Sequence, residues 1–518
     1  MTVVDHVSVK FLGVPLRSTL VDDHDMLRDI RIRNYKRLPS EAPSDLGDQL
    51  EADFFDYQEE LKGEGLLEGS HSTPPTLIHP IFGEFLDDCN SHVPELEDNR
   101  LAYDLRISMS DSFGSEGDRL REFVRVLRRH GIDPRGPEID SERSDSAYRT
   151  DAHIQVNGFR SVIISSKNEM TSGGPQPLYQ AMWLYQRSVG GEDKMRMPIA
   201  TYLNSPLPCL LLYVLGLFCP FLTPIPLLIG MTVGPHVGFA GAVYTDCRCV
   251  QTLSNMVPLA YHRTASGLQL NAARHVGAMR NAIAKLRRYY EVELPSLSRP
   301  GVSRRNVNVL YPYPSEFTSL GHPSESTHHI TYKRRMGGNL VFEATLANGD
   351  LIFVKFVQTY SRETHEECMK LQCAPVLHGF KRLPGHWFMV VMDYLDDGRY
   401  HLPNDSDLSD ELYGAMKSSL VKLHEAGFVH GKICALNTMV ENDDPSKFVL
   451  LGFDWAGKIG EVRYPPYACM VAEELQLQCP DDDYVVDGEP ILAEHDMKML
   501  DVMFPTKRKK AENQEGSE

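Results

Sequence analysis

The feature that most constrains this chain of 518 residues is a pair of short apolar segments near its C-terminal end, each followed by a loop with polar residues. The first segment leads into His430-Gly431-Lys432, with Asn437 a few residues further on. The second, at 448–451, leads into Gly452-Phe453-Asp454. Short apolar runs bounded by glycine-containing loops indicate strands. The sequence therefore predicts two strands whose loops carry the candidate functional residues.

The order of these elements resembles the catalytic centre of a protein-kinase-like fold. In that chemistry an Asp after the His-Gly pair accepts the proton of the substrate hydroxyl, an Asn holds Mg²⁺, and a second Asp after the next strand binds the metal that bridges the nucleotide phosphates. This chain has Lys432 at the first Asp position and Gly452 at the second. A lysine that is charged at neutral pH cannot take a proton from a hydroxyl. The resemblance thus implies a kinase scaffold that lacks two acidic groups.

Upstream of this region, a hairpin predicted over 340–357 carries Lys355 in its apolar return strand. Burying a lysine in a strand costs free energy unless its ammonium group is paired or meets a phosphate. The next predicted helix carries Glu363 and Glu367 one turn apart, and either could pair with it. In kinases such a lysine grips the nucleotide phosphates; an edge-strand lysine that faces water is the alternative. The glycine-rich loop of kinases is represented here only by Gly337-Gly338.

The stretch from about 325 to 505 resembles the kinase-like domain of fungal Crinkler-type proteins, most specifically through the block Phe453-Asp454-Trp455-Ala456-Gly457. Members typically have His-Gly-Asp and Asp-Phe-Asp-Trp where this chain has Lys432 and Gly452 at the acidic positions. The resemblance implies a pseudokinase domain that binds ATP and Mg²⁺ weakly. The catalytic, nucleotide-binding and metal-binding positions that it implies are Lys432, Asn437, Lys355, Glu363, Glu367, Gly337, Gly338 and Asp454.

A second candidate site lies in the middle of the chain, where Asn157-Gly158 joins two strand-like runs at 151–156 and 159–164. An Asn-Gly pair between such runs is a strong hairpin signal. Asp151 begins the first run and Lys167 follows the second. This arrangement resembles the Asp…Glu-x-Lys centre of restriction-endonuclease-like folds, in which two carboxylates hold Mg²⁺ and the lysine orients the attacking water.

The resemblance to a nuclease covers about 105 to 290 and fits Crinkler-type architecture, in which such a domain precedes the kinase-like one. Ser165 stands where the second carboxylate belongs, and a hydroxyl is a poor ligand for a hard cation. Glu169, two residues past Lys167, is the candidate substitute. An ordinary hairpin with surface charges is the alternative interpretation.

The charge balance restricts the partners of the protein. With 53 basic and 71 acidic residues the net charge is −18, so binding of nucleic acid would require a local basic patch. Basic helices predicted at 119–129 and 274–288 would suit a DNA backbone, whereas solvated charged faces are the alternative. The cluster Lys507-Arg508-Lys509-Lys510 predicts nuclear import, with a solvated tail as the alternative. We therefore expect the protein in the nucleus, or in nucleus and cytoplasm.

An apolar run without charges at 210–231 is long enough to cross a bilayer. Pro220, Pro224 and Pro226 argue against a membrane span, because each removes a backbone donor where water cannot replace it. The run fits a buried strand-loop-strand, a membrane span, or an insertion foreign to the domain. We expect no association with a membrane.

The sequence predicts an α+β multidomain protein with a central PD-(D/E)XK nuclease-like α/β domain and a C-terminal bilobal protein-kinase-like domain. The predicted divisions are an acidic, partly ordered leader (1–104), the restriction-endonuclease-like domain (105–292, with the apolar insertion at about 210–231), a Ser/Pro-rich linker (293–328), the kinase-like domain (329–505) and a disordered basic and acidic tail (506–518).

The leading functional hypothesis is a Crinkler-like protein whose pseudokinase and degenerate nuclease-like domains act mainly by binding, with other proteins as partners. An active kinase that phosphorylates Ser or Thr is one alternative, with Asp454 moving into the metal site beside Asn437. A Mg²⁺-dependent DNA nuclease that uses Asp151, Glu169 and Lys167 is another. A membrane-anchored scaffold is the third.

Overall fold

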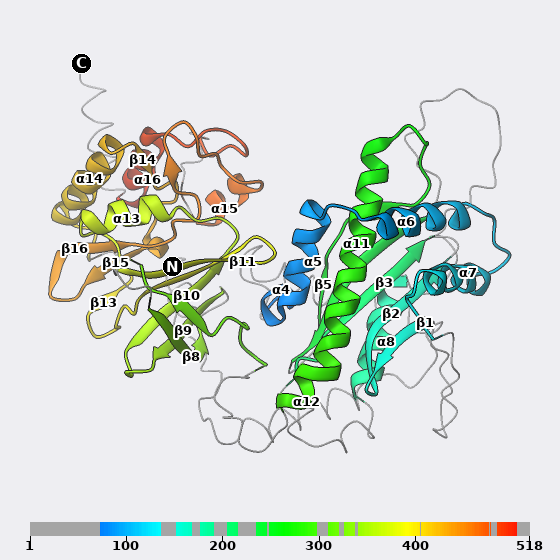
Figure 1. Cartoon of the computed structure of the whole chain (residues 1–518). Helices are drawn as coiled ribbons and strands as arrows, with labels where there is room; N and C mark the ends of the chain where they lie inside the picture. The colour runs from blue at the N-terminus through cyan, green and yellow to red at the C-terminus, as the bar shows by residue number, and fades with distance from the viewer. Residues whose placement is uncertain are drawn as a thin grey trace, which may run out of the picture.

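In the computed structural model, the described residues form two six-stranded sheets that belong to separate units of the chain (Figure 1), and two smaller sheets lie in the second unit. The first unit is built on strands β1–β6 and the second on β7–β17. The structure describes residues 73–135, 152–167, 177–190, 205–215, 235–245, 248–297, 309–320, 326–336 and 340–504, apart from 405, 476 and 478–483.

The first sheet has six strands in the order β1-β2-β3-β4-β5, with β6 paired to β4. All pairs are antiparallel except β2 with β3. The predicted hairpin is confirmed: Asn157 and Gly158 have φ of 48° and 84°, the positive values that a two-residue turn of this kind requires. The strands are β1 (Ala152–Val156), β2 (Phe159–Lys167), β3 (Cys209–Leu215), β4 (His236–Tyr244), β5 (Arg248–Thr252) and β6 (Val257–Pro258).

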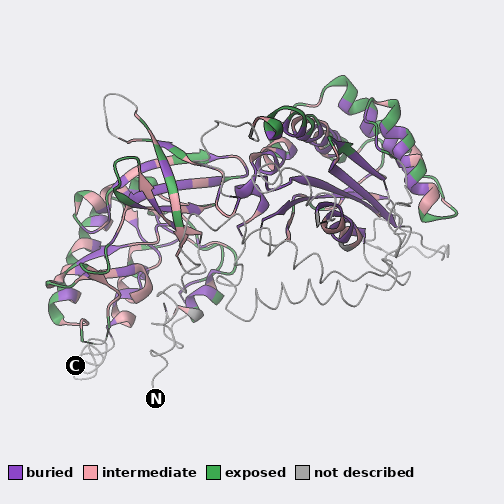
Figure 2. Cartoon of the chain, turned by 90° about the horizontal axis from the view of Figure 1, so that it is seen from below, coloured by how far each residue is buried: buried purple, intermediate pink, exposed green. Residues whose placement is uncertain are grey.

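Helices pack on this sheet, and Figure 2 shows its buried strands between helices on either side. Helix α8 packs against β2 and β3, while α11 packs along α5 and α6. The helices are α4 (Pro75–Ile78), α5 (Pro80–Ser91), α6 (Leu96–Met109), α7 (Glu116–Arg129), α8 (Pro177–Gly190), α11 (Ser266–Arg288), the π-helical turn η2 (Tyr289–Glu293) and α12 (Leu294–Leu297).

The domain boundary predicted at 104 is wrong for the described part of the leader. Phe82 and Phe85 of α5 and Leu101 and Leu105 of α6 are buried in the same core as the sheet. Their apolar side chains recur at helical spacing, so the two helices form an apolar stripe that must be covered. The first unit therefore includes α5 and α6, while α4 contributes Ile78 to this core and Leu77 to the core of the second sheet.

The second sheet is antiparallel throughout, in the order β11-β12-β10-β9-β8-β7. Ile352, Val354 and Phe356 alternate along β10 and are buried, as the predicted hairpin requires. Strand β7 lies inside the predicted linker, which is therefore shorter than expected. The strands are β7 (Glu316–Thr318), β8 (Thr327–Arg335), β9 (Val341–Leu346), β10 (Leu351–Val357), β11 (Leu377–Leu383) and β12 (Trp387–Asp393), and helix α13 (Arg362–Lys370) lies between β10 and β11 in the chain.

A second, mostly helical lobe completes this unit, with a core separate from that of the sheet. Ser409 caps its first helix by accepting a hydrogen bond from the backbone N–H of Leu412. The elements are β13 (Tyr400–His401), α14 (Asp410–Glu425), β14 (Phe428–Val429), the 3-10 turn η4 (Ala435–Asn437), β15 (Thr438–Glu441), β16 (Asp444–Leu450), β17 (Gly457–Lys458), α15 (Ala468–Glu474) and α16 (Ala493–Met503). A bilobal second unit was predicted, and the described residues have this form.

Helices α4 and α5 also contact the second unit. Thr76 Oγ1 donates to Gln251 Oε1 at 2.9 Å in the first unit and accepts from Trp387 Nε1 at 3.1 Å in the second. Gly83 approaches Pro384 so closely that a Cβ atom would lie 2.7 Å from its carbonyl oxygen. These contacts join the two sheets through one short helical segment.

The apolar run at 210–231 begins in β3, where Leu210, Leu211 and Leu212 are fully buried. Its remainder, including the three prolines, lies outside the described residues. No helix within the described ranges combines the length and apolar character needed to cross a membrane.

Candidate functional site

Two pairs of short strands bring the predicted loop residues of the second unit together. β14 pairs with β17, and β15 pairs with β16, so that the loops after β14 and after β16 lie side by side. Asn437 Nδ2 donates to the carbonyl of Lys432 at 3.1 Å, and the N–H of Leu451 donates to the carbonyl of Asn437 at 2.8 Å. The structure therefore places Lys432, Asn437, Gly452 and Asp454 in one region, as the sequence predicted.

The His-Gly turn is fixed by the carboxylate of Asp496, which is fully buried in α16. The backbone N–H groups of His430 and Gly431 donate to its two oxygens at 2.8 and 2.6 Å. His424 Nε2 lies 2.9 Å from Asp496 Oδ2. Gly431 has φ of 76°, a conformation that disfavours side chains. Asp496 is therefore a positioning residue for the loop that carries Lys432.

Helix α13 contacts the second loop through a stack of buried rings. The ring of His365 lies parallel to that of Phe453, with 4.5 Å between centroids, and His430 packs against Phe453 at 5.1 Å. Tyr360 and the carbonyl of Pro375 hydrogen-bond the two nitrogens of His365 at 2.7 and 2.8 Å. Burial lowers the pKa of His365 to about 4, so this ring is neutral at neutral pH.

The ion pair of Lys355 differs from the prediction. Its Nζ lies 2.5 Å from Asp454 Oδ1, whereas Glu363 pairs with Lys458 at 3.1 Å and Glu367 with Lys370 at 2.7 Å. The expectation that a glutamate of α13 holds Lys355 is wrong. The reason is the face that α13 presents to the core, which carries Thr364, His365 and Cys368. The two glutamates lie off this face and pair with Lys458 and Lys370 instead.

The electrostatic environment keeps Asp454 ionised. Burial alone favours its neutral form, but Lys355 and Lys432 outweigh this effect and hold the pKa of Asp454 below its ordinary value. Lys432 Nζ lies 4.9 Å from the centroid of the Trp455 ring, at the distance of a cation–π contact. Burial lowers the pKa of Lys432, and the Asp454 carboxylate acts in the opposite direction.

The residues of this region do not fit the Mg²⁺ site that a kinase scaffold implies. Gly452 has φ of 80°, and a Cβ atom there would lie 2.6 Å from Asn437 Oδ1. Mg²⁺ requires near-octahedral oxygen ligands, yet the nearby carboxylate, Asp454, is bound to Lys355. Among the described residues, no group of three His, Cys, Asp or Glu side chains could hold a metal ion. The predicted Gly337 and Gly338 lie outside the described residues.

The nuclease-like candidate site is only partly described. Ser165 and Lys167 lie on the same side of β2 and are 0% and 6% exposed, while Asp151 and Glu169 lie outside the described residues. The Asp…Ser-x-Lys arrangement therefore stays a prediction. What the structure adds is that the lysine belongs to a buried strand rather than to a surface loop.

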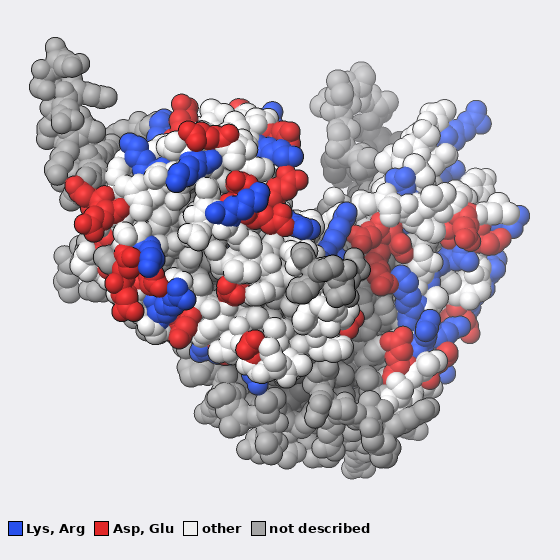
Figure 3. Space-filling view, turned by 60° about the vertical axis from the view of Figure 1, so that its left-hand side comes forward, with Lys and Arg blue, Asp and Glu red and all other residues white. Residues whose placement is uncertain are grey.

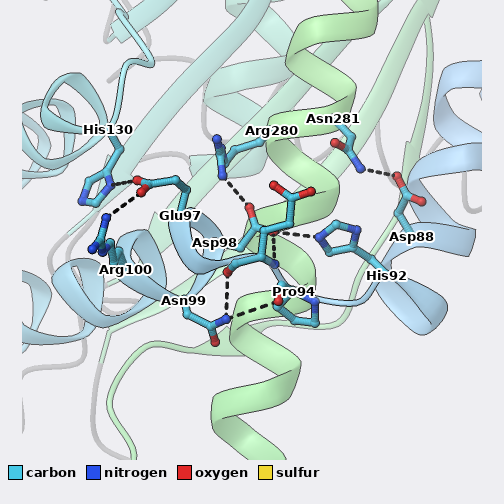
Figure 4. Close-up of polar contacts among 11 residues, drawn as sticks. Asp88, His92, Pro94, Glu97, Asp98, Asn99, Arg100, His130, Arg280 and Asn281 are labelled. Carbon is cyan, nitrogen blue, oxygen red and sulfur yellow. Dashed lines mark hydrogen bonds and ion pairs between the residues drawn. The ribbon is translucent and has the colours of Figure 1, made fainter.

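The two basic helices of the first unit have many of their charges paired with acidic residues. On α7, Arg121 pairs with Asp118, and Arg125 lies 2.7 Å from Glu122. On α11, Arg280 lies 2.7 Å from the buried Asp98, as Figure 4 shows, and Lys285 lies 2.6 Å from Glu84. Figure 3 shows basic and acidic side chains interspersed on one face of the molecule. DNA binding through these helices stays a prediction.

A cavity of about 340 Å³ lies beside α11 in the first unit. Its lining includes Arg280, Arg287 and Arg288, the acidic Asp133 and Glu291, and apolar residues such as Ile154. Basic and acidic groups are thus mixed in its wall.

Comparisons with known proteins return protein kinases among solved structures, while no protein-family model and no curated protein matches the chain. The kinase PK-1 of Cydia pomonella granulovirus is 14% identical over 32% of this chain and 63% of that chain, with a TM-score of 0.23. Vaccinia related kinase 3 is 17% identical over 36% and 67%, with a TM-score of 0.26.

The kinase domain of maize sucrose-induced receptor kinase 1, bound to AMP-PNP, is 19% identical over 34% of this chain and 67% of that chain, with a TM-score of 0.25. This chain thus spans about two thirds of the length of these kinases, or slightly less. Similarity at these TM-scores carries no conclusion about activity, which rests on the geometry of the site itself.

Proposed function

We propose that the second unit is a kinase-like pseudokinase domain of a Crinkler-type protein, which binds a nucleotide and acts mainly by binding rather than by turnover. The observation that carries the proposal is the group formed by Lys355, Asp454 and Lys432 between the sheet and the helical lobe. The resemblance to kinases supports this, because Lys355 corresponds in it to the strand lysine that contacts nucleotide phosphates. The ligand proposed is of the same class as the AMP-PNP bound to the maize kinase domain.

Phosphoryl transfer is not expected, because both acidic groups on which it depends are replaced. Lys432 stands at the position of the proton acceptor, and a protonated amine has no lone pair for a hydroxyl proton. Gly452 stands at the position of the metal carboxylate and offers no ligand. Loss of a single electrostatic group of this kind commonly costs roughly 10²–10³ in rate. Two such losses leave binding as the remaining activity.

The test combines nucleotide binding and phosphotransfer on the same preparation of the full chain. We expect ATP to raise the melting temperature of wild type, with no transfer of the γ-phosphate to the protein itself or to a generic Ser/Thr substrate. Lys355→Met should abolish the shift, while Lys447→Met, which replaces an exposed lysine of β16, should retain it. Robust autophosphorylation that Asp454→Asn abolishes would establish the active-kinase alternative instead.

A reversion variant sharpens the same test. Lys432→Asp with Gly452→Asp restores both acidic groups and should recover measurable transfer if only these two positions were lost. The structure adds a condition, because Asn437 Oδ1 occupies the space that the side chain introduced by Gly452→Asp would enter. The variant therefore requires rotation of the Asn437 side chain, and because Gly452 has φ of 80°, the new side chain also strains the backbone at position 452.

A further inference from the structure

The charged group at the proposed nucleotide site is unbalanced toward the positive side. Lys355 is paired with Asp454 at 2.5 Å, and the ammonium group of Lys432 faces the Trp455 ring at 4.9 Å. Asp454 and Lys355 are both close enough to Lys432 to influence its ionisation electrostatically. Two lysines therefore share one carboxylate at the place where the phosphates of a nucleotide would lie.

We infer that Lys432 takes the place of the divalent cation, so that the site binds a nucleoside triphosphate without Mg²⁺. This inference rests on the proposed function and names how the same site recognises its ligand. Lys355 and Lys432 would both contact the phosphate chain, and each ammonium group offers three donors to phosphate oxygens. No covalent step is involved.

The position of Lys432 is held by the surrounding structure. Asp496 clamps the backbone of the preceding His430 and Gly431, and Asn437 donates to the carbonyl of Lys432 itself. The main chain at Lys432 is thus fixed, while its ammonium group is held by a ring instead of a carboxylate. A cation–π contact is weaker than a desolvated contact with phosphate, so a nucleotide can draw this ammonium group away from Trp455.

The same residues oppose a metal-bound nucleotide. A cation bridging the phosphates would lie beside Lys432, which repels it, and would find no carboxylate at Gly452. One oxygen of Asp454, Oδ1, is already paired with Lys355, so this carboxylate has only its other oxygen left for such a cation. The free triphosphate, which carries more negative charge than its Mg²⁺ complex, is therefore the better match for a site with excess positive charge.

The experiment is calorimetric titration of the full chain with ATP, in EDTA and in excess Mg²⁺. We expect binding in EDTA, with Mg²⁺ leaving the affinity unchanged or lowering it. Lys432→Met keeps the apolar stem over Trp455 and should weaken binding in EDTA by roughly tenfold or more. The matched control Lys447→Met removes an exposed lysine that pairs with Asp444 and should bind as wild type does.

The failure of the inference and the failure of the proposed function are distinguishable. Binding that occurs only with Mg²⁺, or binding in EDTA that is unaffected in Lys432→Met, would overturn the inference and leave the proposed function in place. Absence of binding under both conditions would overturn both. The melting temperature of the unliganded Lys432→Met protein separates a loss of binding from a loss of folding, and Lys432→Gln provides a second uncharged variant.

Discussion

Asp98 in the first unit and Asp454 in the second satisfy their carboxylates in different ways. In the first unit, Asp98 accepts hydrogen bonds from Arg280 at 2.7 Å and from the backbone N–H of Glu95 at 2.9 Å, and it lies 2.8 Å from His92 (Figure 4). These contacts hold helices α6 and α11 and the segment before α6 together. In the second unit, Asp454 joins a strand to a loop, and a further lysine lies nearby.

This difference separates a structural role from a functional one. A carboxylate that is surrounded by matched donors stabilises a fold and has no capacity left for a ligand. A carboxylate that two lysines share leaves positive charge available, which is costly in a partly buried place unless an anion binds there. Perturbed charges of this kind cluster at functional sites. The second unit is therefore the better candidate for ligand binding.

The largest effect that we expect concerns Asp496, the acidic residue of the second unit that is satisfied as completely as Asp98. Asp496→Ala leaves the buried N–H groups of His430 and Gly431 without their acceptor. Removing one partner from a buried charged contact commonly costs about 3–5 kcal/mol. This loss of unfolding free energy should appear in urea denaturation of the full chain, monitored with a probe that reports on the second unit.

The control for that measurement is Asp444→Ala, which removes a partly exposed aspartate of β16 and should unfold near the wild-type urea concentration. Asp496→Asn, which retains one acceptor oxygen, should fall between the two. Equal stability of Asp496→Ala and wild type would show that the His-Gly turn is held by other contacts, and that the second unit does not depend on a buried acidic clamp.

The next prediction concerns pH. Burial lowers the pKa of His365 from 6.5 to about 4, so the folded protein binds this proton less readily than the unfolded chain. The contribution of the neutral ring to the free energy of unfolding is fully present above pH 6.5. It is lost as pH falls toward 4, which lowers the free energy of unfolding by roughly 3 kcal/mol in all. Stability measured by urea denaturation across this range should decline on acidification.

The share that belongs to His365 can be isolated by substitution. His365→Gln should reduce the slope of stability against pH between 6.5 and 4 by about 1.4 kcal/mol per unit, the value for one proton. His329→Gln, on an exposed part of β8, serves as the control and should retain the slope. The buried His79 of the first unit, whose pKa is lowered to about 3, contributes equally to the pH dependence of stability in both variants.

The sequence predicts best those features that depend on neighbouring residues. The turn at Asn157-Gly158 requires positive φ at both positions, which these two residue types favour, and it forms as predicted. The alternation along β10 likewise follows from its own residues. In contrast, the pairing of Lys355 with Asp454 joins residues far apart in the chain. The spacing of Glu363 and Glu367 gave no reason to exclude them as partners of Lys355.

The prediction for residues 75–109 failed for a different reason. The acidic composition of the first hundred residues led to the prediction of a leader, although Ile81, Phe82, Phe85 and Cys89 follow a helical spacing that could have identified α5 as part of a core. Composition averages over a segment, whereas burial depends on which face each side chain occupies. The clamp by Asp496 had no local signal, because its partners are backbone groups more than sixty residues away.

The smallest effect that we expect tests whether the two units are energetically coupled. Trp387 of the second unit donates to Thr76, which also donates to Gln251 of the first unit. Trp387→Phe keeps an aromatic ring but removes the donor, at a cost of about 1 kcal/mol. Thr76→Val removes the acceptor. If the contact joins the units, the double variant should lose less stability than the sum of the single variants in urea denaturation. Strictly additive losses would mean that the hydrogen bond between Trp387 and Thr76 does not couple the two units energetically.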